Sequence, residues 1–453
     1  MNAVYCGGME INMPIFKLGK AKVPHRKNTA EMPAVRMPAP STVCIPMAQH
    51  IGAPATPIVN SGDRVYVGTK IADASGYVSA PIHSSVSGTV KRIDNFLSSN
   101  GKSCQAIVIE SDGEMTPDPE IKAPSVKNLD EFCDAIRASG LVGLGGAGFP
   151  TAVKLDAAKK GILKKAIING AECEPYITSD TRTMIDDAEY VARGVAHLKK
   201  YIGVEEVIFG IEKNKGEAIR KLSAIFADDE SVKIVTLPET YPQGAEKILI
   251  YNSTGLTVPE GGLPSDIGCL VMNVTTLAFI AKYMETGMPL VEKRVTVDGS
   301  AIKSPMNVIV PIGASIRELI EFTGNSTDGI CKALYGGPMM GIAVYSLDDP
   351  ILKHSNAITL LSAKDAAKPA AFACIHCGRC VDICPMGLTP PLYARAMKVE
   401  DKSERIARLT EAKINLCMEC GCCSFVCPSR RPLVETNRLA KAEIRNAQSA
   451  KKN

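Results

Sequence analysis

The sequence predicts a multidomain chain that joins α/β and α+β folds to a small all-α module. The 453 residues exceed what one hydrophobic core usually organises, since domains typically hold about 50–200 residues. Helical and apolar strand-like runs alternate over residues 128–285, which is typical of a parallel sheet covered by helices. Eight of the 16 cysteines form two short, regularly spaced arrays near the C-terminus, a distribution that favours metal binding over disulfides.

The composition is that of a folded chain without a nucleic-acid partner. Hydrophobic residues make up 45%, charged residues 22%, and the net charge is only +4, which excludes a wholly disordered chain and gives no support for nucleic-acid binding. The longest apolar stretch, residues 267–284, is interrupted by Asn273 and Lys282, so no membrane-spanning helix is predicted. Because a secretory signal pattern is absent at the start, we expect a cytosolic location or the cytoplasmic face of a membrane.

The first 113 residues predict an extended arm followed by a small β domain. Residues 1–40 carry five prolines among scattered cations and show no periodicity, which indicates an arm. Residues 41–113 contain short β-like runs separated by turn residues, and they resemble the barrel-sandwich fold of biotinyl and lipoyl carrier domains. The turn Asp73-Ala74-Ser75-Gly76 lacks the lysine that those carriers modify. We therefore expect a structural or docking module.

Two further domains are predicted between this β domain and the cysteine arrays. Residues 128–285 predict an α/β domain with a mainly parallel sheet, in which helices are expected at 129–139, 186–201 and 215–226 and strands at 165–168 and 206–211. Residues 291–350 show a strand, a turn at Asp298-Gly299, a second strand and a helix. This order resembles the β-grasp (SLBB-like) domain of soluble-ligand-binding proteins and respiratory flavoproteins.

The strongest chemical signal is a cysteine spacing that occurs twice within residues 368–440. Each run reads C-x2-C-x2-C-x3-C-P, the spacing that is typical of paired [4Fe-4S] clusters, in which the fourth cysteine of one run completes the other cluster. The predicted ligands are Cys374, Cys377, Cys380 and Cys427 for one cluster and Cys417, Cys420, Cys423 and Cys384 for the other. Zinc is the rival occupant of such thiolate sites.

The segment between the arrays predicts helices rather than a tight hairpin. Helical patterns are expected at residues 392–397 and 404–412, so the dicluster module should be all-α. Cys422 lies beside Cys423, and a cluster bound through Cys422 instead would break the repeated spacing, so Cys422 is expected to be a packing residue. Residues 441–453 are assigned to a basic C-terminal tail.

A glycine-rich loop is the second chemical signal. Gly143-Leu144-Gly145-Gly146-Ala147-Gly148 matches G-x-G-x-x-G, but a helix rather than a strand is expected before it, so the usual dinucleotide fingerprint does not apply. Its backbone N–H groups can still approach an anion, and Lys154 follows in a helical stretch. A purely structural turn is the alternative.

Three polar segments follow this loop in the chain: Asn169-Gly170-Ala171-Glu172-Cys173-Glu174-Pro175, Tyr241-Pro242-Gln243-Gly244-Ala245-Glu246 and Asn273-Val274-Thr275-Thr276. Together with the loop they resemble the FMN and NADH site of the flavoprotein subunit of respiratory complex I, although Ala171 and Leu144 stand where that family often has Asp and Arg. The resemblance implies that Gly143, Gly145, Gly146, Lys154, Asn169, Glu172, Asn273 and Thr276 bind FMN, and that Phe149, Glu174, Tyr241, Gly244 and Glu246 line the nucleotide site.

The order of all domains resembles the RnfC family, which belongs to the Rnf ion-translocating ferredoxin:NAD oxidoreductase complexes. Outside the predicted flavin and cluster sites, the segments that most resemble this family are Tyr77 to Val90 and Gly336 to Gly341. The resemblance implies a peripheral subunit that holds non-covalent FMN and two [4Fe-4S] clusters and uses NAD(H) as substrate. It also implies that this subunit docks on membrane and iron–sulfur subunits and reaches ferredoxin through them. The whole complex would transport Na+ or H+. No separate catalytic side chain is expected, since a flavin itself links hydride and single-electron chemistry.

Two alternatives stay open at this point. One is a cobalamin reductase-like flavin and iron–sulfur protein of a microcompartment, against which the long segment before Gly143 counts. The other is an electron-transfer scaffold that does not bind nucleotide. Reduction of bound flavin by NADH separates the scaffold from the enzyme.

Overall fold

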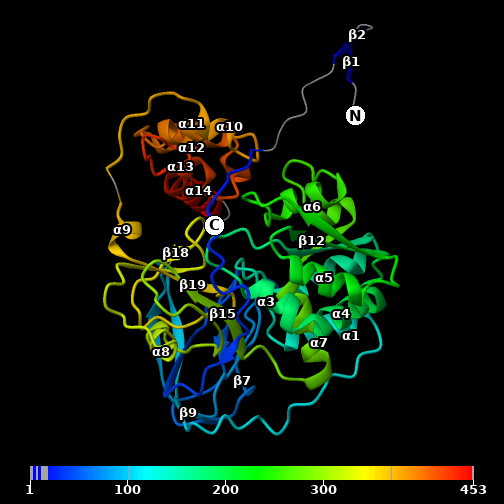
Figure 1. Ribbon diagram of the computed structural model, residues 1–453. Helices are drawn as coiled ribbons and strands as arrows, with labels where there is room; N and C mark the ends of the chain where they lie inside the picture. Colours follow the sequence, from blue (N-terminus) through cyan, green and yellow to red (C-terminus); the bar gives the residue numbers. More distant parts are fainter. Residues whose placement is uncertain (1–3, 7–8, 12–18, 100, 369, 451–453) are drawn as a thin grey trace. The chain divides into compact units, whose positions relative to one another are not determined.

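The structure is a computed structural model that describes residues 4–6, 9–11, 19–99, 101–368 and 370–450. It divides into two units, Val23–Lys368 and Met1–Lys22 with Pro369–Asn453, and each is described by itself (Figure 1). Much of the expected arm, residues 1–3, 7–8 and 12–18, lies outside the described residues, as do residues 451–453 of the expected tail. No helix in the described ranges has the length and hydropathy needed to cross a membrane.

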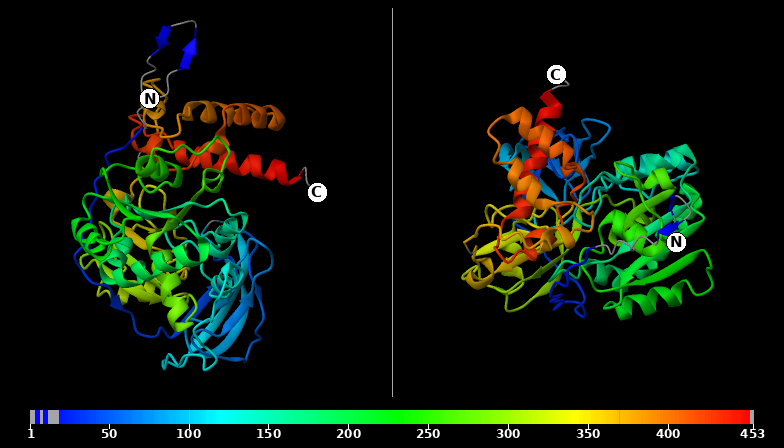
Figure 2. Two further views of the ribbon diagram at one scale, coloured as in Figure 1. Left: turned by 90° about the vertical axis from the view of Figure 1, so that its right-hand side faces the viewer. Right: turned by 90° about the horizontal axis from the view of Figure 1, so that it is seen from above.

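The larger unit contains the expected barrel-sandwich fold, which is built from two small antiparallel sheets. The four-stranded sheet has the order β4 (Thr42–Pro46), β10 (Ser103–Ser111), β9 (Gly88–Leu97), β6 (Arg64–Val65), and the three-stranded sheet the order β5 (Thr56–Pro57), β7 (Lys70–Asp73), β8 (Ile82–His83). Figure 2 shows the long hairpin of β9 and β10. Alternate side chains such as Ile45, Ile107 and Ile109 are fully buried between the sheets, as a period of two residues requires.

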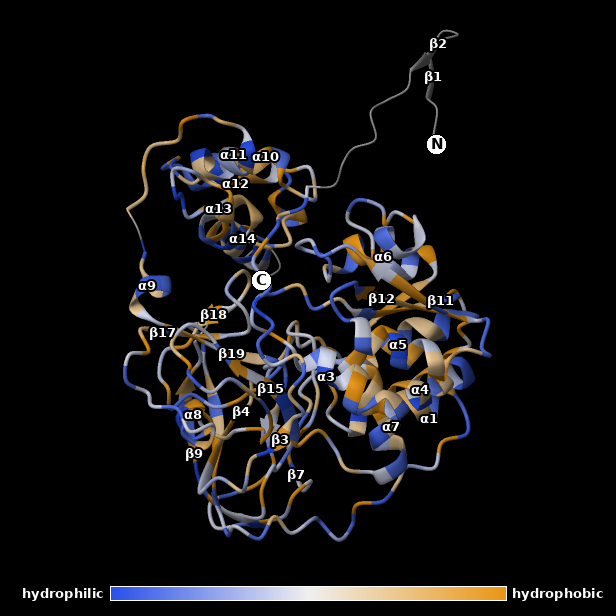
Figure 3. Cartoon of the chain, in the orientation of Figure 1, coloured by the Kyte–Doolittle hydropathy of each residue, from blue (hydrophilic) through white to orange (hydrophobic). Residues whose placement is uncertain are grey.

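A parallel four-stranded sheet forms the centre of the expected α/β domain. Its strands, in spatial order, are β13 (Val232–Leu237), β12 (Glu206–Glu212), β11 (Lys165–Gly170) and β14 (Cys269–Asn273). Figure 3 shows β11 and β12 as largely apolar strands, which is typical of a parallel sheet covered on both faces. The sheet confirms the α/β prediction.

Seven α-helices accompany this sheet in the described part of the domain. They are α1 (Leu129–Ala138), α2 (Thr151–Leu155), α3 (Ser179–Asp186), α4 (Ala188–His197), α5 (Gly216–Ile225), α6 (Glu246–Thr254) and α7 (Val274–Thr286). The Asn128 side chain accepts the Glu131 N–H at 2.9 Å and fixes the start of α1. The expected helix at residues 186–201 is in fact two pieces, since α4 is followed by a π-helical turn at Leu198–Ile202.

A six-stranded mixed sheet forms the β-grasp part. Its order is β18 (Ile342–Ala343), β17 (Lys332–Tyr335), β19 (Ala357–Leu361), β15 (Glu292–Asp298), β16 (Met306–Pro311), β3 (Val35–Arg36), and its helices are α8 (Ile316–Phe322) and α9 (Ala363–Ala366). The edge strand β3 comes from residues 1–40 and pairs with β16 in parallel. This part of the arm therefore completes a sheet edge that would otherwise expose unpaired backbone groups.

The smaller unit is helical around the cysteine arrays, as expected. Its described α-helices are α10 (Arg379–Asp382), α11 (Pro390–Ala396), α12 (Lys402–Glu411), α13 (Cys422–Phe425) and α14 (Leu433–Ala450). The strands β1 (Val4–Cys6) and β2 (Met9–Ile11) pair antiparallel. Residues 441–450 continue α14 and do not form the expected tail. Ala440 and Ile444, one helical turn apart, are both buried in the core of this unit with Tyr393, which explains why the helix continues.

A buried lysine predicts a pH-dependent stability. The Lys353 Nζ donates to the carbonyls of Pro81 at 2.6 Å and Gly140 at 2.7 Å, without a described carboxylate partner, and burial lowers its pKa to about 7. The unfolded chain, whose lysines keep a pKa of about 10.4, binds more protons above pH 7, so this group makes the free energy of unfolding rise with pH from about 7 to about 10.

Lys353→Met is expected to reduce the increase of the free energy of unfolding between about pH 7 and pH 10. Urea unfolding at several pH values measures this free energy. The neighbouring imidazole of His83 stays neutral in this window because burial and the Lys353 charge lower its pKa to about 3. Lys91→Met, which alters an exposed lysine, is the control. Identical pH dependence in both variants would contradict the assignment.

Candidate functional site

The glycine loop lies at the carboxyl edge of the parallel sheet. Asn273 is the last residue of β14, and Asn169, its partner in register, is the last residue but one of the neighbouring strand β11. The Leu144 N–H donates to the Thr276 Oγ1 at 2.9 Å, and a Cβ on Gly145 would lie 2.8 Å from the Asn273 Nδ2. The absence of a side chain at Gly145 therefore lets the loop approach the strand end, where ligands of open parallel sheets bind.

The loop presents its backbone to solvent. Gly145, Gly146 and Ala147 are exposed, and Gly146 has a φ of 113° with nothing within 4 Å of an added Cβ. The Gly143 N–H closes the loop by donating to the Phe149 carbonyl at 2.8 Å, and Phe149 is half-buried. An exposed glycine-rich backbone of this kind suits the phosphate of a flavin nucleotide.

Lys154 and Glu246, expected at the flavin and the nucleotide, are brought together. The Lys154 Nζ on α2 lies 2.9 Å from the Glu246 Oε1 at the start of α6, and it also donates to the Val271 carbonyl of β14 at 3.0 Å. Their side chains are 35% and 41% exposed. A cation and a carboxylate thus stand together at the carboxyl edge, within reach of solvent.

The segment from Tyr241 to Glu246 lies against the end of β11. The Asn169 Nδ2 donates to the Gly244 carbonyl at 2.9 Å, and a Cβ on Gly244 would lie 2.8 Å from the Ala171 carbonyl. The Tyr241 hydroxyl, almost wholly buried, makes a long contact of 3.5 Å to the Glu174 Oε1. The expected nucleotide residues Tyr241 and Gly244 therefore share one side of the site with Glu174.

Glu174 has partners that the sequence did not suggest. Its carboxylate accepts the backbone N–H groups of Met339 at 3.0 Å and Met340 at 2.7 Å. A Cβ on Gly337 would lie 2.2 Å from the Glu174 Oε2, so glycine is required there. Burial raises the pKa of Glu174. In this structure the carboxylate anchors the loop around Met339.

A buried polar network lies beneath the glycine loop. Glu172 accepts the Asp180 N–H at 2.8 Å at the start of α3, and Asp180 accepts the Asn273 Nδ2 at 2.7 Å. Burial and the Glu172 charge raise the pKa of Asp180 to about 6. The Lys293 Nζ donates to the Leu144 carbonyl at 2.9 Å, and burial lowers its pKa to about 8. Glu172 thus supports the loop from below and does not face solvent.

Sequence reasoning missed Lys27, Asp180 and Lys293. The Lys27 Nζ donates to the carbonyls of Glu172 at 2.6 Å, Glu174 at 2.8 Å and Ile177 at 2.6 Å, and so fixes the segment after β11. Nothing in the irregular arm marks this lysine. Lys293 did carry a signal, since charged residues inside a buried strand are unusual and indicate a paired or functional group.

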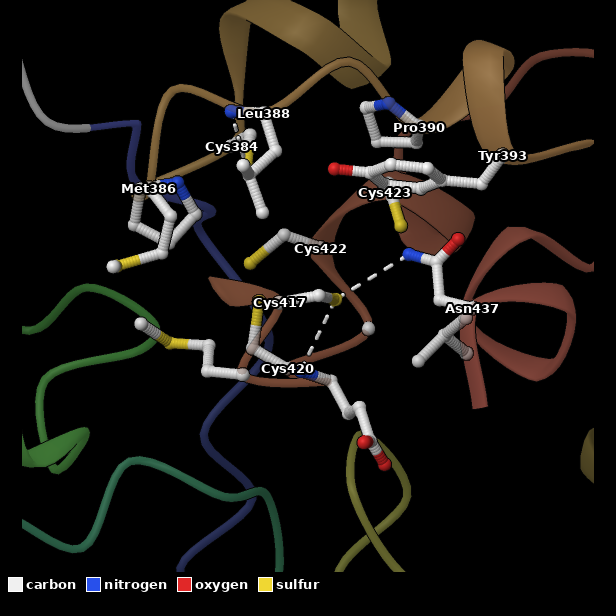
Figure 4. Close-up of a pocket in the computed structure, with 15 residues that line it drawn as sticks. Cys384, Met386, Leu388, Pro390, Tyr393, Cys417, Cys420, Cys422, Cys423 and Asn437 are labelled. Atoms are coloured by element: carbon white, nitrogen blue, oxygen red, sulfur yellow. Dashed lines mark hydrogen bonds between the residues drawn. The ribbon is translucent and has the colours of Figure 1, made fainter. Parts of the chain in front are cut away.

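The eight array cysteines line two separate cavities. Cys374, Cys377, Cys380 and Cys427 line the first, whose volume is about 520 Å³, and Cys384, Cys417, Cys420 and Cys423 line the second, together with Cys422 (Figure 4). These are the two sets that the spacing assigns to two clusters. Nowhere in the described ranges do three Cys, His, Asp or Glu side chains converge closely enough to hold a single metal ion, whereas a cubane is held by four separated thiolates at its corners.

Backbone and amide N–H groups point at the sulfurs of the second cavity. The Cys417 Sγ accepts from Glu419 N and Asn437 Nδ2, both at 3.4 Å, and the Cys384 Sγ accepts from Leu388 N at 3.3 Å. Such donors stabilise ligating sulfurs and tune cluster potentials. Burial raises the pKa of Cys423 to about 12, so metal binding there must release a proton. The donor set fits a thiolate-bound cluster.

Family models match three parts of the chain. Residues 136–282 match the Nuo51 FMN-binding domain, residues 16–114 the RnfC barrel sandwich hybrid domain, and residues 373–430 a 4Fe-4S dicluster domain. The crystal structure of an air-oxidised NAD+-reducing [NiFe]-hydrogenase resembles this chain with a TM-score of 0.50 at 18% identity, over 70% of this chain and 63% of that chain. This chain spans less than two thirds of that hydrogenase chain, and the likeness concerns the fold alone.

Curated relatives match over most of their length. The chain is 41% identical over 444 residues to the RnfC subunit of the Na+-translocating ferredoxin:NAD+ oxidoreductase complex of Acetobacterium woodii, covering 96% of this chain and 98% of that protein. It is 42% identical over 375 residues to the RnfC subunit of the proton-translocating complex of Clostridium ljungdahlii, covering 82% and 81%. With this identity over nearly the whole length, and with FMN-binding and dicluster domains in one chain, the protein belongs to the RnfC family of the Rnf-type ion-translocating ferredoxin:NAD+ oxidoreductase complexes.

Proposed function

We propose that this chain is the NADH-handling electron-transfer subunit of a membrane complex that couples ferredoxin:NAD+ electron transfer to ion transport. The observation that carries the proposal is the combination of an exposed glycine loop at the sheet edge with two four-thiol cavities in one chain. FMN, when bound, supplies the exchange between hydride and single-electron transfer. The near-complete match to an RnfC protein leaves the cobalamin reductase-like alternative without support.

The residues divide into four groups by proposed role. The backbone from Gly143 to Gly146 and the Lys154 charge hold FMN, while Asn169, Asn273, Thr276 and Glu172 fix the loop and the strand ends. The proposed nucleotide residues are Phe149, Glu174, Tyr241, Gly244 and Glu246, and the proposed cluster ligands are the eight cysteines of the arrays. We further propose a peripheral position on the cytoplasmic face, contact with membrane and iron–sulfur subunits, and an indirect path to ferredoxin.

The proposed domain limits follow the sequence pattern. They are an arm at residues 1–40, a barrel-sandwich domain at 41–113, an FMN and NADH domain at 128–285, a β-grasp domain at 291–350 and a dicluster domain at 368–440. Helix α14 supports extending the last domain to at least residue 450.

The experiment is reduction of an artificial one-electron acceptor by NADH, using the full chain reconstituted anaerobically with iron, sulfide and FMN. We expect reduction that depends on FMN and that NADPH supports poorly. FMN-loaded protein that NADH does not reduce would favour the scaffold without nucleotide binding.

Glu246→Gln is expected to raise the KM for NADH about tenfold, because a carboxylate accepts hydrogen bonds from ribose hydroxyls more strongly than an amide oxygen does. Steady-state kinetics measure the effect, with FMN content and cluster absorbance recorded for each variant. Glu205→Gln, which alters an exposed surface pair with Lys164, is the control.

Glu174→Gln should also raise the KM, together with a loss of stability, since Glu174 anchors the Met339 loop. Unchanged kinetics in both variants would place the nucleotide on other residues.

A further inference from the structure

The peptide group between Leu144 and Gly145, inside the glycine loop, is held from behind. The Leu144 carbonyl accepts a hydrogen bond from the Lys293 Nζ at 2.9 Å, and the Leu144 N–H donates to the Thr276 Oγ1 at 2.9 Å. The Leu144 side chain is itself buried. Both backbone polar groups of Leu144 are therefore fixed by side chains that come from outside the loop.

The direction of the Leu144 carbonyl determines where the next N–H group points. The Leu144–Gly145 peptide bond is trans, since the cis bond among the described residues is Tyr241-Pro242. In a planar trans peptide group the C=O and the N–H point in opposite directions. The Leu144 carbonyl points at a buried ammonium group, so the Gly145 N–H points away from Lys293. Gly145 is exposed, and no residue of the described ranges accepts its N–H.

Glycine at position 145 makes this peptide group easy to rotate. A flip of the peptide plane changes ψ of Leu144 and φ of Gly145, and glycine adopts positive and negative φ with similar ease. A flipped group would turn the Leu144 carbonyl outward, where the negative end of its dipole repels a phosphate. The residue that lets the loop approach Asn273 therefore needs a partner that keeps this carbonyl turned inward, and Lys293 is that partner.

Packing alone does not explain a lysine at position 293. Lys293 lies on β15 of the β-grasp part and is only 3% exposed. The charges of Asp180 and Glu172 act on it through space, but no carboxylate in the described part of the chain forms an ion pair with its Nζ, whereas the adjacent Arg294 lies 3.0 Å from Asp187. A buried ammonium group without an ion pair is costly, and an apolar side chain would fill the strand position without that cost.

We propose that Lys293 is a positioning residue for FMN, which holds the Leu144 carbonyl inward so that the Gly145 N–H faces the phosphate group. The inference rests on the proposed function, because it requires FMN at the glycine loop. Lys293 acts through one peptide group and does not touch the ligand. Its charge on the carbonyl side also polarises that group, which strengthens the N–H as a donor. The β-grasp part thereby contributes to a site whose expected residues all belong to the α/β domain.

The test compares FMN with riboflavin, which lacks the phosphate. Lys293→Met keeps a long side chain but removes the charge and the donor. We expect the preference for FMN over riboflavin, given by the ratio of their dissociation constants, to fall by about tenfold or more. Quenching of flavin fluorescence on titration with the full chain measures both constants. Equal weakening of FMN and riboflavin binding would show a general structural loss and overturn the inference.

Arg294→Met is the matched control, because it removes a buried cation from the next residue of β15. Arg294 donates to the Thr183 Oγ1 at 2.8 Å, and no hydrogen bond joins it to the loop in the described ranges. The preference for FMN should change by less than about threefold in this variant. A fall equal to that in Lys293→Met would assign the effect to lost positive charge in general and overturn the positioning role.

Lys293→Gln restores a hydrogen-bond donor without the charge, so it should recover part of the preference that Lys293→Met loses. Urea unfolding without FMN shows which variants are folded. If Lys293→Met does not fold, Lys293→Gln takes its place, with an expected fall in preference of about threefold or more. Wild-type preference in Lys293→Gln would then overturn the inference.

The wild-type chain separates this inference from the proposed function. A folded wild-type chain that binds no FMN would count against the proposed function itself. Wild-type FMN binding that persists unchanged in folded Lys293→Met would overturn the positioning role of Lys293 alone.

Discussion

Replacing Cys384 with serine is expected to abolish the cluster of the second array and to leave the first one in place. Cys384 belongs to the first array by sequence but lines the second cavity with Cys417, Cys420 and Cys423. Iron content should fall from about eight to about four atoms per chain. EPR of the anaerobically reduced protein, recorded with the full chain, identifies which of the two signals is lost.

Cys422→Ser is the matched control for this result. Cys422 lines the same cavity and is almost wholly buried, but it lies outside the repeated spacing. Both clusters should therefore persist in this variant. A Cys384→Ser protein that loses only the cluster of the first array would show that the fourth cysteines do not cross between the clusters. Zinc in place of iron after anaerobic reconstitution would contradict the cluster assignment altogether.

Replacing Lys154 with alanine is expected to weaken FMN binding by about tenfold or more. Hydrogen bonds to charged groups contribute about 1.5–3 kcal/mol, and about 1.4 kcal/mol corresponds to a factor of ten. The lysine stands at the carboxyl edge, held by the Val271 carbonyl and by Glu246. Quenching of FMN fluorescence on titration with the protein measures the dissociation constant.

The loss of Lys154 also leaves Glu246 without its cation, which by itself would repel an anionic ligand. The double variant Lys154→Ala/Glu246→Gln separates the two effects, since it removes both charges. We expect it to recover only part of the lost affinity. Lys159→Ala, which alters a surface lysine paired with Asp130 at 3.0 Å, is the control. Wild-type FMN affinity in Lys154→Ala would move the phosphate site elsewhere.

The sequence by itself determined the features that depend on local spacing. The repeated C-x2-C-x2-C-x3-C-P run predicts which thiols can meet around one cluster, because a short loop fixes the distances between its own sulfurs. The alternation of apolar runs over residues 128–285 predicts the parallel sheet for a similar reason, since hydrophobic periodicity follows directly from helix and strand geometry. The glycine loop was also visible in the order of the residues alone.

Only the tertiary structure decided which partners the charged groups have. Lys27, in an arm without periodicity, fixes the segment after β11, and Glu174 is engaged by the backbone of Met339 and Met340, far along the chain. Residues 441–450 read as a basic tail but form a helix, because Ile444 packs into a core supplied by distant residues. Contacts of this kind depend on how the chain folds back on itself, and local sequence patterns carry no record of them.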